Sequence, residues 1–290
     1  MKKFKGIIPA LVTPYTKEGN INETSLRKVI RMNLEKQCTG FYVGGSTAEA
    51  FVLSMNERKK LIDIVVDEVN GEGTVIYHVG NIGTAESIEL AVYGEKAGAD
   101  AISAIPPFYY KFSFEEIKKH YKAIVEKVDI PMIVYNFPVL SGVQLSLENL
   151  EDILSDDRII GVKHTSLNVF EVERLKCRND KHVLSGHDEV FLASLTMGAD
   201  GAIGSTFNLM AEKFVKIYQL FHENNMKDAL RIQREANNVI EALIKVGVNQ
   251  GIKYGLEKKG IECNGCRSPF KHLRDDAKTY LDKIFEENNV

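Results

Sequence analysis

Several features that would assign this chain quickly to a class of protein are scarce or absent. No apolar run approaches the roughly 20 residues that a membrane-spanning helix needs, and residues 6–12 are broken by Pro9 and lack a signal-peptide cleavage site. Charge of one sign is not in excess, because 37 Lys and Arg face 40 Asp and Glu. We therefore expect no membrane and no nucleic acid as partner, and we interpret residues 7–12 as a strand.

Cysteine is also scarce, with four residues in a chain of 290. Cys263 and Cys266 have C-x-x-C spacing, but no second pair of Cys or His stands near enough to complete a zinc site. In a chain of this size without a secretory signal, reduced thiols are favoured over disulfides. The cysteines thus predict a cytoplasmic protein without structural zinc.

Two glycine-rich nucleotide-binding motifs are missing as well. No G-x-G-x-x-G follows the first expected strand, and no G-x-x-x-x-G-K-[ST] occurs, which argues against a doubly wound open sheet. Instead, strand-length apolar runs alternate with helix-length amphipathic segments. Eight such units in about 200 residues predict an α/β protein, a (β/α)8 TIM barrel with a parallel sheet. The expected strands are 7–12, 40–43, 75–79, 101–105, 132–135, 159–163, 182–185 and 201–203.

The helical segments have recognisable starts, and they dominate the end of the chain. Ser54 and Glu57, for example, have the spacing of a capping box at the start of a helix. After Asn208 the pattern becomes wholly helical. We expect a barrel core over residues 1–207, then the last barrel helix and a C-terminal helical extension over residues 208–290, in one structural domain overall.

The most informative stretch is Ile159-Ile160-Gly161-Val162-Lys163, which reads as a short buried strand that ends on a lysine. Lysine is rarely fully buried. Desolvation lowers the pKa of its ammonium group and leaves a neutral amine that can attack a carbonyl carbon. The plain alternative is a lysine that simply reaches solvent at the end of its strand, and the surrounding residues must decide between the two.

Tyr135 lies 28 residues before Lys163, which is one strand-helix repeat. If the two strands are neighbours, their ends stand roughly 5 Å apart. A phenol beside an amine-derived iminium is a plausible proton carrier. A single tyrosine can equally well cap a barrel core, so this residue alone decides nothing.

Three further loops follow expected strands, at the end of the barrel where active sites are built. In Gly44-Gly45-Ser46-Thr47, backbone N–H groups and two hydroxyls could hold a carboxylate, or the segment could be a plain glycine-rich turn. In Gly186-His187-Asp188-Glu189, the two acids could bind sugar hydroxyls, hold a metal or cap the next helix. Further ligands at metal spacing are lacking, so we expect no metal. Ser205 adds a small polar group after the last strand.

Taken in order, these loops make a specific set of motifs. The motifs are Tyr42-Val-Gly-Gly-Ser-Thr47 with Glu49, Pro107-Phe-Tyr-Tyr110, Val134-Tyr-Asn-Phe-Pro138, Gly161-Val-Lys-His-Thr165 and Gly201-Ala-Ile-Gly-Ser-Thr206. The set resembles the class I pyruvate aldolase family that contains N-acetylneuraminate lyase and dihydrodipicolinate synthase, from Lys5 to about Phe270. The lyase branch is the better match. Synthases typically place an arginine after Tyr-Asn-x-Pro, whereas Val139-Leu140-Ser141 has no cation here and suits a neutral amino sugar.

The resemblance implies reversible cleavage of N-acetylneuraminate (sialic acid) to N-acetylmannosamine and pyruvate through a Schiff base, with no metal or organic cofactor. Lys163 would form the Schiff base, and Tyr135 would move the proton. Ser46 and Thr47 would hold the carboxylate, and Thr165 would contact the substrate beside the imine. The polyol tail would meet a further set of residues, namely Gly186, Asp188, Glu189 and Ser205.

By the same resemblance, Tyr109 would complete a proton relay in a neighbouring subunit, so we expect an oligomer, and specifically a homotetramer. Three other functions stay open: dihydrodipicolinate synthase, another 2-keto-3-deoxy sugar-acid aldolase, and a non-catalytic sialic-acid-binding sensor. A sensor, however, would have no use for both a buried lysine and a tyrosine beside it. Ala48, Leu167 and Asn249 depart from the family pattern and bear on substrate tolerance.

Overall fold

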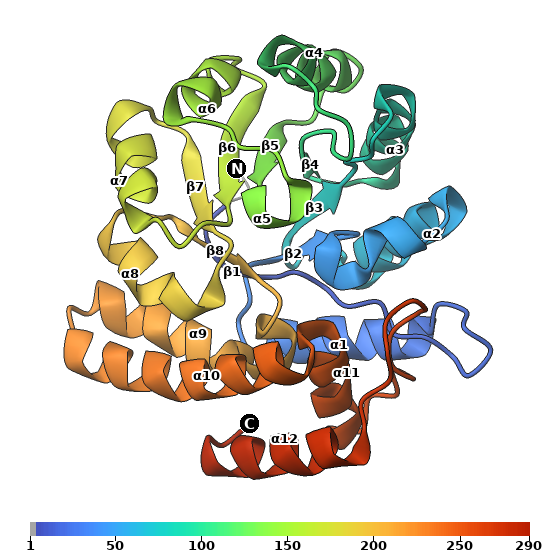
Figure 1. Cartoon of the computed structure of the whole chain (residues 1–290), viewed down its shortest axis with the longest axis vertical. Helices are drawn as coiled ribbons and strands as arrows, with labels where there is room; N and C mark the ends of the chain where they lie inside the picture. Colours follow the sequence, from blue (N-terminus) through green and yellow to red (C-terminus); the bar gives the residue numbers. More distant parts are fainter. Residues whose placement is uncertain (1–3) are drawn as a thin grey trace.

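The computed structural model describes residues 4–290, and it is a barrel of parallel strands surrounded by helices (Figure 1). The predicted TIM barrel with C-terminal helices is confirmed. Eight strands follow the order β1-β8-β7-β6-β5-β4-β3-β2 in this part of the chain. The ring closes between β1 and β2, where the Leu11 N–H donates to the Tyr42 carbonyl over 2.9 Å. The strands are β1 (Gly6–Pro9), β2 (Gly40–Val43), β3 (Thr74–His78), β4 (Ala101–Ala104), β5 (Met132–Asn136), β6 (Ile159–His164), β7 (His182–Ser185) and β8 (Gly201–Gly204).

The pleat of these strands decides which side chains meet inside the ring, because successive side chains point to opposite faces. Val134 and Val162 belong to the apolar layer between strands and helices. Their neighbours Tyr135 and Lys163 face the interior, and the two residues are direct partners in the β5–β6 register. Tyr42 of β2 belongs to the same interior cluster as Tyr135. The barrel therefore brings an amine and two phenols to one place.

The helices lie outside the ring, and the capping box predicted at Ser54 and Glu57 is confirmed at the start of α2. The helices that follow β1 to β7 are α1 (Glu23–Glu35), α2 (Met55–Val69), α3 (Thr84–Ala97), α4 (Phe114–Val125), α5 (Pro138–Ser141), α6 (Leu147–Leu154), α7 (Val169–Arg178) and α8 (Phe191–Thr196). Three single turns of 3-10 helix lie in the loops after β2 and β7, namely η1 (Ser46–Ala48), η2 (Ala50–Val52) and η3 (Asp188–Val190). Across residues 4–290, every helix is too short or too polar to span a lipid bilayer.

The last four helices stack on one side of the barrel, beside α1 and β1 (Figure 1). They are α9 (Phe207–His222), α10 (Met226–Val246), α11 (Val248–Lys258) and α12 (Asp275–Glu287). The predicted boundary at residue 208 between core and extension stays a prediction, and residues 1–3 of the expected core lie outside the described residues. What matters for the site is that α10 and α11 reach the carboxyl ends of the strands.

Two predicted boundaries differ from the structure by more than one residue. The first strand ends at Pro9 rather than at residue 12, because the hydrogen-bond partners change there: Ala10 donates to Gly204, and Leu11 donates to Tyr42. Asn208 does not precede the helical part but lies inside α9. Its side-chain amide donates to the Ala10 carbonyl over 2.7 Å and so ties α9 to the barrel.

A substitution at Gly201 tests whether β1 and β8 need to lie as close together as the structure shows. A Cβ at this position would lie 2.8 Å from the carbonyl carbon of Gly6, which is backbone and cannot swing away. We expect Gly201→Ala to lower the free energy of unfolding by about 1–3 kcal/mol, as overpacking does, and to lower the melting temperature by several degrees. Thermal unfolding measures both values.

Gly73→Ala is the matched control, because a Cβ there comes no nearer than 3.4 Å to another atom. Equal melting temperatures for the two variants would contradict the tight β1–β8 contact.

Candidate active site

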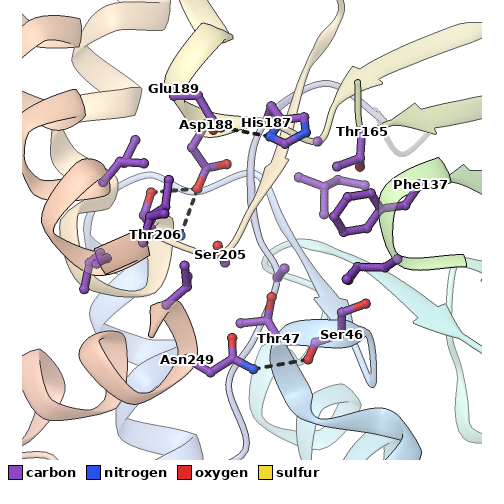
Figure 2. A pocket seen from close by; sticks show the side chains of 18 of the residues that line it. Ser46, Thr47, Phe137, Thr165, His187, Asp188, Glu189, Ser205, Thr206 and Asn249 are labelled. Carbon is purple, nitrogen blue, oxygen red and sulfur yellow. Dashed lines mark hydrogen bonds and ion pairs between the residues drawn. The ribbon is translucent and has the colours of Figure 1, made fainter. Parts of the chain in front are cut away.

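A cavity of about 570 Å³ opens at the carboxyl ends of the strands, and nine of the ten residues predicted for the site line it. Figure 2 shows that the loops after β2, β6, β7 and β8 bring Ser46, Thr165, Asp188 and Ser205 to this cavity. The nine residues are Ser46, Thr47, Tyr135, Lys163, Thr165, Gly186, Asp188, Glu189 and Ser205. Residues separated by more than 150 positions in the chain thus share one pocket.

Burial in this cavity changes the pKa of the Lys163 amine. Its side chain extends into the barrel from β6, and only 5% of the residue is exposed. The amine Nζ lies 4.1 Å from the ring centre of Tyr135 and 4.3 Å from that of Tyr42. Burial lowers the pKa of Lys163 to about 7, and the negative charge of Asp188 works in the opposite direction. A large fraction of the amine is therefore neutral near pH 7.

Tyr135 lies across the β5–β6 ladder from Lys163 and is equally buried. Burial raises the pKa of Tyr135 to about 12, while its side-chain neighbours Ser46 and Thr165 oppose that rise. The phenol is consequently protonated in the free site. A positive charge formed on Lys163 would favour the phenolate, since opposite charges a few ångströms apart stabilise each other.

Thr165 and Gly186 fit together at the ends of β6 and β7. A Cβ on Gly186 would lie 2.8 Å from the Cβ of Thr165 and closer still to its hydroxyl oxygen. Glycine is needed here for space, and it leaves the Thr165 hydroxyl at the cavity wall two residues from Lys163.

The loop after β2 forms the single turn η1, with Ser46 and Thr47 as its first residues. A helical turn leaves its first N–H groups without acceptors, and within residues 4–290 no group accepts from the N–H of Ser46 or Thr47. Two glycines come before this turn, and glycine in general lets backbone approach a ligand closely. Gly45 serves a different purpose, because a Cβ there would lie 2.6 Å from the ring of Tyr42.

The two acids after β7 have different surroundings. Asp188 is buried, and its Oδ2 accepts hydrogen bonds from the backbone N–H and the hydroxyl of Thr206, over 2.9 and 2.7 Å (Figure 2). Its Oδ1 is buried without a hydrogen-bond partner among the described residues. Burial raises the pKa of Asp188 to about 6. Burial would also raise the pKa of Glu189, but the hydrogen bond with His187, over 3.0 Å, contributes to a lower value than usual.

Helices α10 and α11 form the wall opposite the strands. Ile244, Gly247 and Asn249 line the cavity from this side, together with Phe270 from the loop before α12. The side chain of Asn249 donates to the Ser46 carbonyl over 3.4 Å, a long hydrogen bond (Figure 2). The extension thus contributes to the pocket and is not merely attached to the barrel.

Tyr109 is the one predicted site residue that the structure does not bring to this cavity. Its side chain is 81% exposed, and it packs against the Tyr110 ring at 5.0 Å between ring centres. Its φ of +77° is a left-handed conformation that is uncommon for a bulky residue. The role predicted for it in a neighbouring subunit stays a prediction.

Three residues with contacts in the site, Tyr42, Thr206 and His187, were not among the predicted site residues. Tyr42 could have been found from the alternation along β2, because the same parity places Tyr135 and Lys163 inside the barrel. Thr206 and His187 act through contacts with Asp188 and Glu189, which no local pattern shows.

A TIM barrel with a buried lysine beside a tyrosine has the arrangement of an aldolase-type lyase. Residues 3–288 match the Dihydrodipicolinate synthetase family, and the chain belongs to that family. It is similar to N-acetylneuraminate lyase 2 of Escherichia coli O6:H1, with 44% identity over 287 residues that cover 98% of this chain and 94% of that protein.

Solved structures show the same likeness. The Clostridium difficile protein CdNal, in complex with mannosamine, is 41% identical with a TM-score of 0.95, and the match covers 99% of both chains. N-acetylneuraminate lyase from Fusobacterium nucleatum, complexed with pyruvate, is 37% identical with a TM-score of 0.92, over 98% of this chain and 96% of that one. The fold, the family and the lyase class are therefore shown.

The burial of Lys163 predicts a measurable titration. The lysine amines can be methylated reductively with ¹³C-formaldehyde and followed by NMR as the pH is raised. We expect the Lys163 signal, identified by its absence in Lys163→Arg, to change from ammonium to free amine with a midpoint near pH 7. A midpoint close to the unperturbed lysine value of about 10.4 would show that the amine is solvated.

Proposed function

We propose that this protein cleaves N-acetylneuraminate reversibly into N-acetylmannosamine and pyruvate through a Schiff base on Lys163. The observation that carries the proposal is the amine of Lys163, buried 4.1 Å from the ring centre of Tyr135 and with a pKa lowered to about 7. The mannosamine and pyruvate complexes of the two relatives support this choice of substrate.

The first step uses the neutral amine. Lys163 adds to the C2 keto carbon of the open-chain sugar acid, and the added hydroxyl leaves as water with the proton of the Tyr135 phenol, which gives an iminium ion beside a phenolate. The low pKa favours this addition because no proton must first be removed from an ammonium group in an apolar setting. The iminium then places a positive charge beside Tyr135.

The positive charge of the iminium makes the second step possible. It lowers the pKa of the Tyr135 phenol from its raised value, so the phenolate can take the proton of the C4 hydroxyl. The C3–C4 bond breaks as the C4 oxygen forms an aldehyde, and the bonding electrons move into the iminium to give an enamine. N-acetylmannosamine leaves, a proton returns to C3, and hydrolysis of the resulting iminium releases pyruvate and restores the amine.

Recognition is divided between the two ends of the cavity. The free N–H groups and the hydroxyls of Ser46 and Thr47 would hold the carboxylate next to C2. Thr165 would contact the substrate beside the imine. The polyol and its N-acyl group would bind at the opposite end, where the pocket offers Gly186, Asp188, Glu189 and Ser205.

The cationic side chains of the cavity lining favour the lyase over dihydrodipicolinate synthase. No arginine lines the cavity within residues 4–290, and Lys163 is the only lysine that does. An amino-acid semialdehyde carries a second carboxylate and calls for a second cation, whereas an amino sugar with an acylated nitrogen carries no such charge.

We also propose that the active form is a cytoplasmic homotetramer in which Tyr109 takes part in the proton relay of a neighbouring subunit. The exposure of Tyr109 and its positive φ support a role at a protein surface that another subunit covers. The further exposed apolar residues Tyr110, Val139 and Leu140 fit the same interpretation.

Borohydride reduction in the presence of pyruvate tests the mechanism. We expect a fixed mass increase on the peptide that holds Lys163, and none in Lys163→Ala, which should lose turnover but keep the fold. Tyr135→Phe should still be trapped but should cleave the sugar acid about 10²–10⁴ times more slowly, as expected when a general base is removed. Full activity of Tyr135→Phe would remove this tyrosine from the mechanism.

Substrate choice is tested separately. Pyruvate release from N-acetylneuraminate is compared with condensation of pyruvate and aspartate semialdehyde at equal enzyme concentration. We expect the first reaction to dominate because the polyol end of the pocket offers no second cation. The opposite result would identify a synthase, and tight binding of the sugar acid without pyruvate release would identify a sensor.

A further inference from the structure

A buried ion pair connects two residues that the proposed chemistry does not use. Lys253 of α11 donates to the carboxylate of Glu49, which directly follows η1, and both side chains are completely inaccessible to solvent. The two residues are 204 positions apart in the chain, and neither lines the main cavity. Buried charges are costly unless they are paired and fully hydrogen-bonded, so a pair at this depth requires an explanation.

Both residues of the pair make further contacts with the surrounding chain. Lys253 also donates to the Gly265 carbonyl over 2.8 Å, and its ammonium lies 4.2 Å from the ring centre of Tyr15. The second oxygen of Glu49 accepts from the backbone N–H of Arg267 over 2.8 Å. The pair therefore joins four segments of chain: the loop after β1, the loop after β2, helix α11 and the loop before α12.

The position of Glu49 relative to the carboxylate loop is the decisive feature. Glu49 ends η1 in a left-handed conformation, with a φ of +62°, and Ser46 and Thr47 are the first two residues of that turn. Any movement of Glu49 is therefore transmitted to the two N–H groups proposed to bind the carboxylate. On the other side of the turn, the hydroxyl of Thr13 donates to the Ala48 carbonyl over 2.8 Å.

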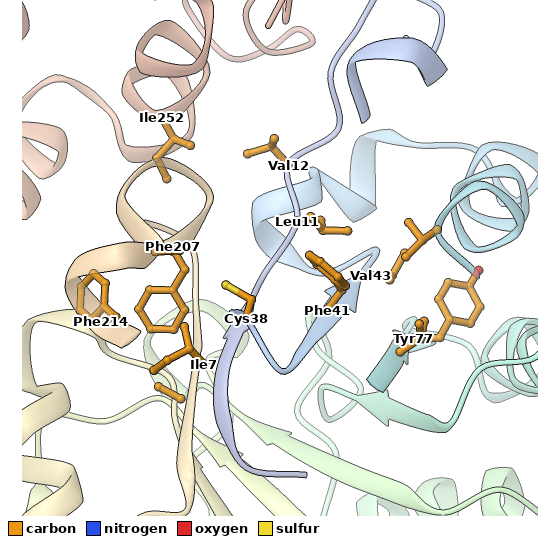
Figure 3. Close-up of a cluster of buried hydrophobic side chains, with 14 of the residues drawn as sticks. Ile7, Leu11, Val12, Cys38, Phe41, Val43, Tyr77, Phe207, Phe214 and Ile252 are labelled. Atoms are coloured by element: carbon orange, nitrogen blue, oxygen red, sulfur yellow. The ribbon is translucent and has the colours of Figure 1, made fainter. Parts of the chain in front are cut away.

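Helix α11 holds the other end of the same turn. Asn249 lies one helical turn before Lys253 and therefore on the same face of α11, and its side chain donates to the Ser46 carbonyl. The helix itself is fixed in the core through Ile252, which belongs to the cluster that also contains Val12 and Phe207 (Figure 3). One face of α11 thus contacts η1 at both ends, at Ser46 and at Glu49.

We propose that Lys253, Glu49 and Asn249 are positioning residues that hold the Ser46–Thr47 turn in the conformation that binds the substrate carboxylate. This inference rests on the proposed function, and it assigns to the C-terminal extension a part of the affinity for 2-keto acids. A purely stabilising pair would be an inefficient choice, because buried ion pairs are often no more stabilising than apolar residues of similar size.

Pyruvate is the probe for the test, because it has the carboxylate and the keto group but no polyol tail. The pyruvate concentration that gives half-maximal trapping by borohydride is measured by intact mass. Glu49→Gln/Lys253→Met removes both charges together, so that no unpaired charge is left in the interior. We expect this double variant to need about tenfold more pyruvate, the loss expected when the hydrogen bonds of a charged ligand are misplaced. Trapping at saturating pyruvate should still be complete because Lys163 is intact.

The matched control is Lys213→Met/Glu235→Gln. It removes another ion pair, which is partly buried, joins α9 to α10 and lies outside the cavity lining. We expect it to lower the melting temperature without changing the half-saturating pyruvate concentration. Glu49→Gln/Lys253→Met with a wild-type half-saturating concentration would overturn the proposal, whatever its melting temperature.

Asn249→Ala keeps the test decisive if the double variant does not fold. It removes one partly buried amide at the other end of the turn, and we expect a rise of about threefold in the half-saturating pyruvate concentration. A wild-type value in Asn249→Ala would then refute the proposal. Failure of the proposed function has a different signature, namely wild-type protein that pyruvate and borohydride leave unmodified, and it would refute this inference as well.

Discussion

The exclusion of water from the amine of Lys163 is the constraint on which the rest of this structure depends. An ammonium group loses much of its hydration between two aromatic rings, and its pKa falls to about 7. The ring of strands surrounds this side chain while each strand stays hydrogen-bonded to its neighbours in the sheet. The register of β5 against β6 then fixes the tyrosine opposite the lysine.

The same burial sets the protonation of the other groups in the cavity. It raises the pKa of Tyr135 to about 12 and that of Asp188 to about 6, so the empty site holds less charge than its composition suggests. A negatively charged substrate that forms an iminium changes this balance. The cation then favours the phenolate of Tyr135 and the ionised form of Asp188 at the same moment, so the first chemical step creates the conditions for the second.

The sequence could predict the barrel and its reacting pair because both depend on regular spacing. The alternation of strands with helices gives the closed sheet, and one strand-helix repeat places Tyr135 opposite Lys163. Contacts without a period could not be predicted. The pairing of Glu49 with Lys253 depends on how α11 packs on the barrel 204 residues later in the chain, and the role proposed for Tyr109 depends on a neighbouring subunit.

The arrangement separates the chemistry from the choice of substrate. The groups proposed to react, Lys163 and Tyr135, stand on β5 and β6, which are held on both sides by paired strands. The end of the cavity proposed to bind the polyol is built from the loop after β7, the loop after β8 and the helices α10 and α11. Loops and helix ends can change their side chains without disturbing a strand register. A change of aldehyde therefore requires substitutions at that end alone, whereas the carboxylate turn must stay in place for any 2-keto acid.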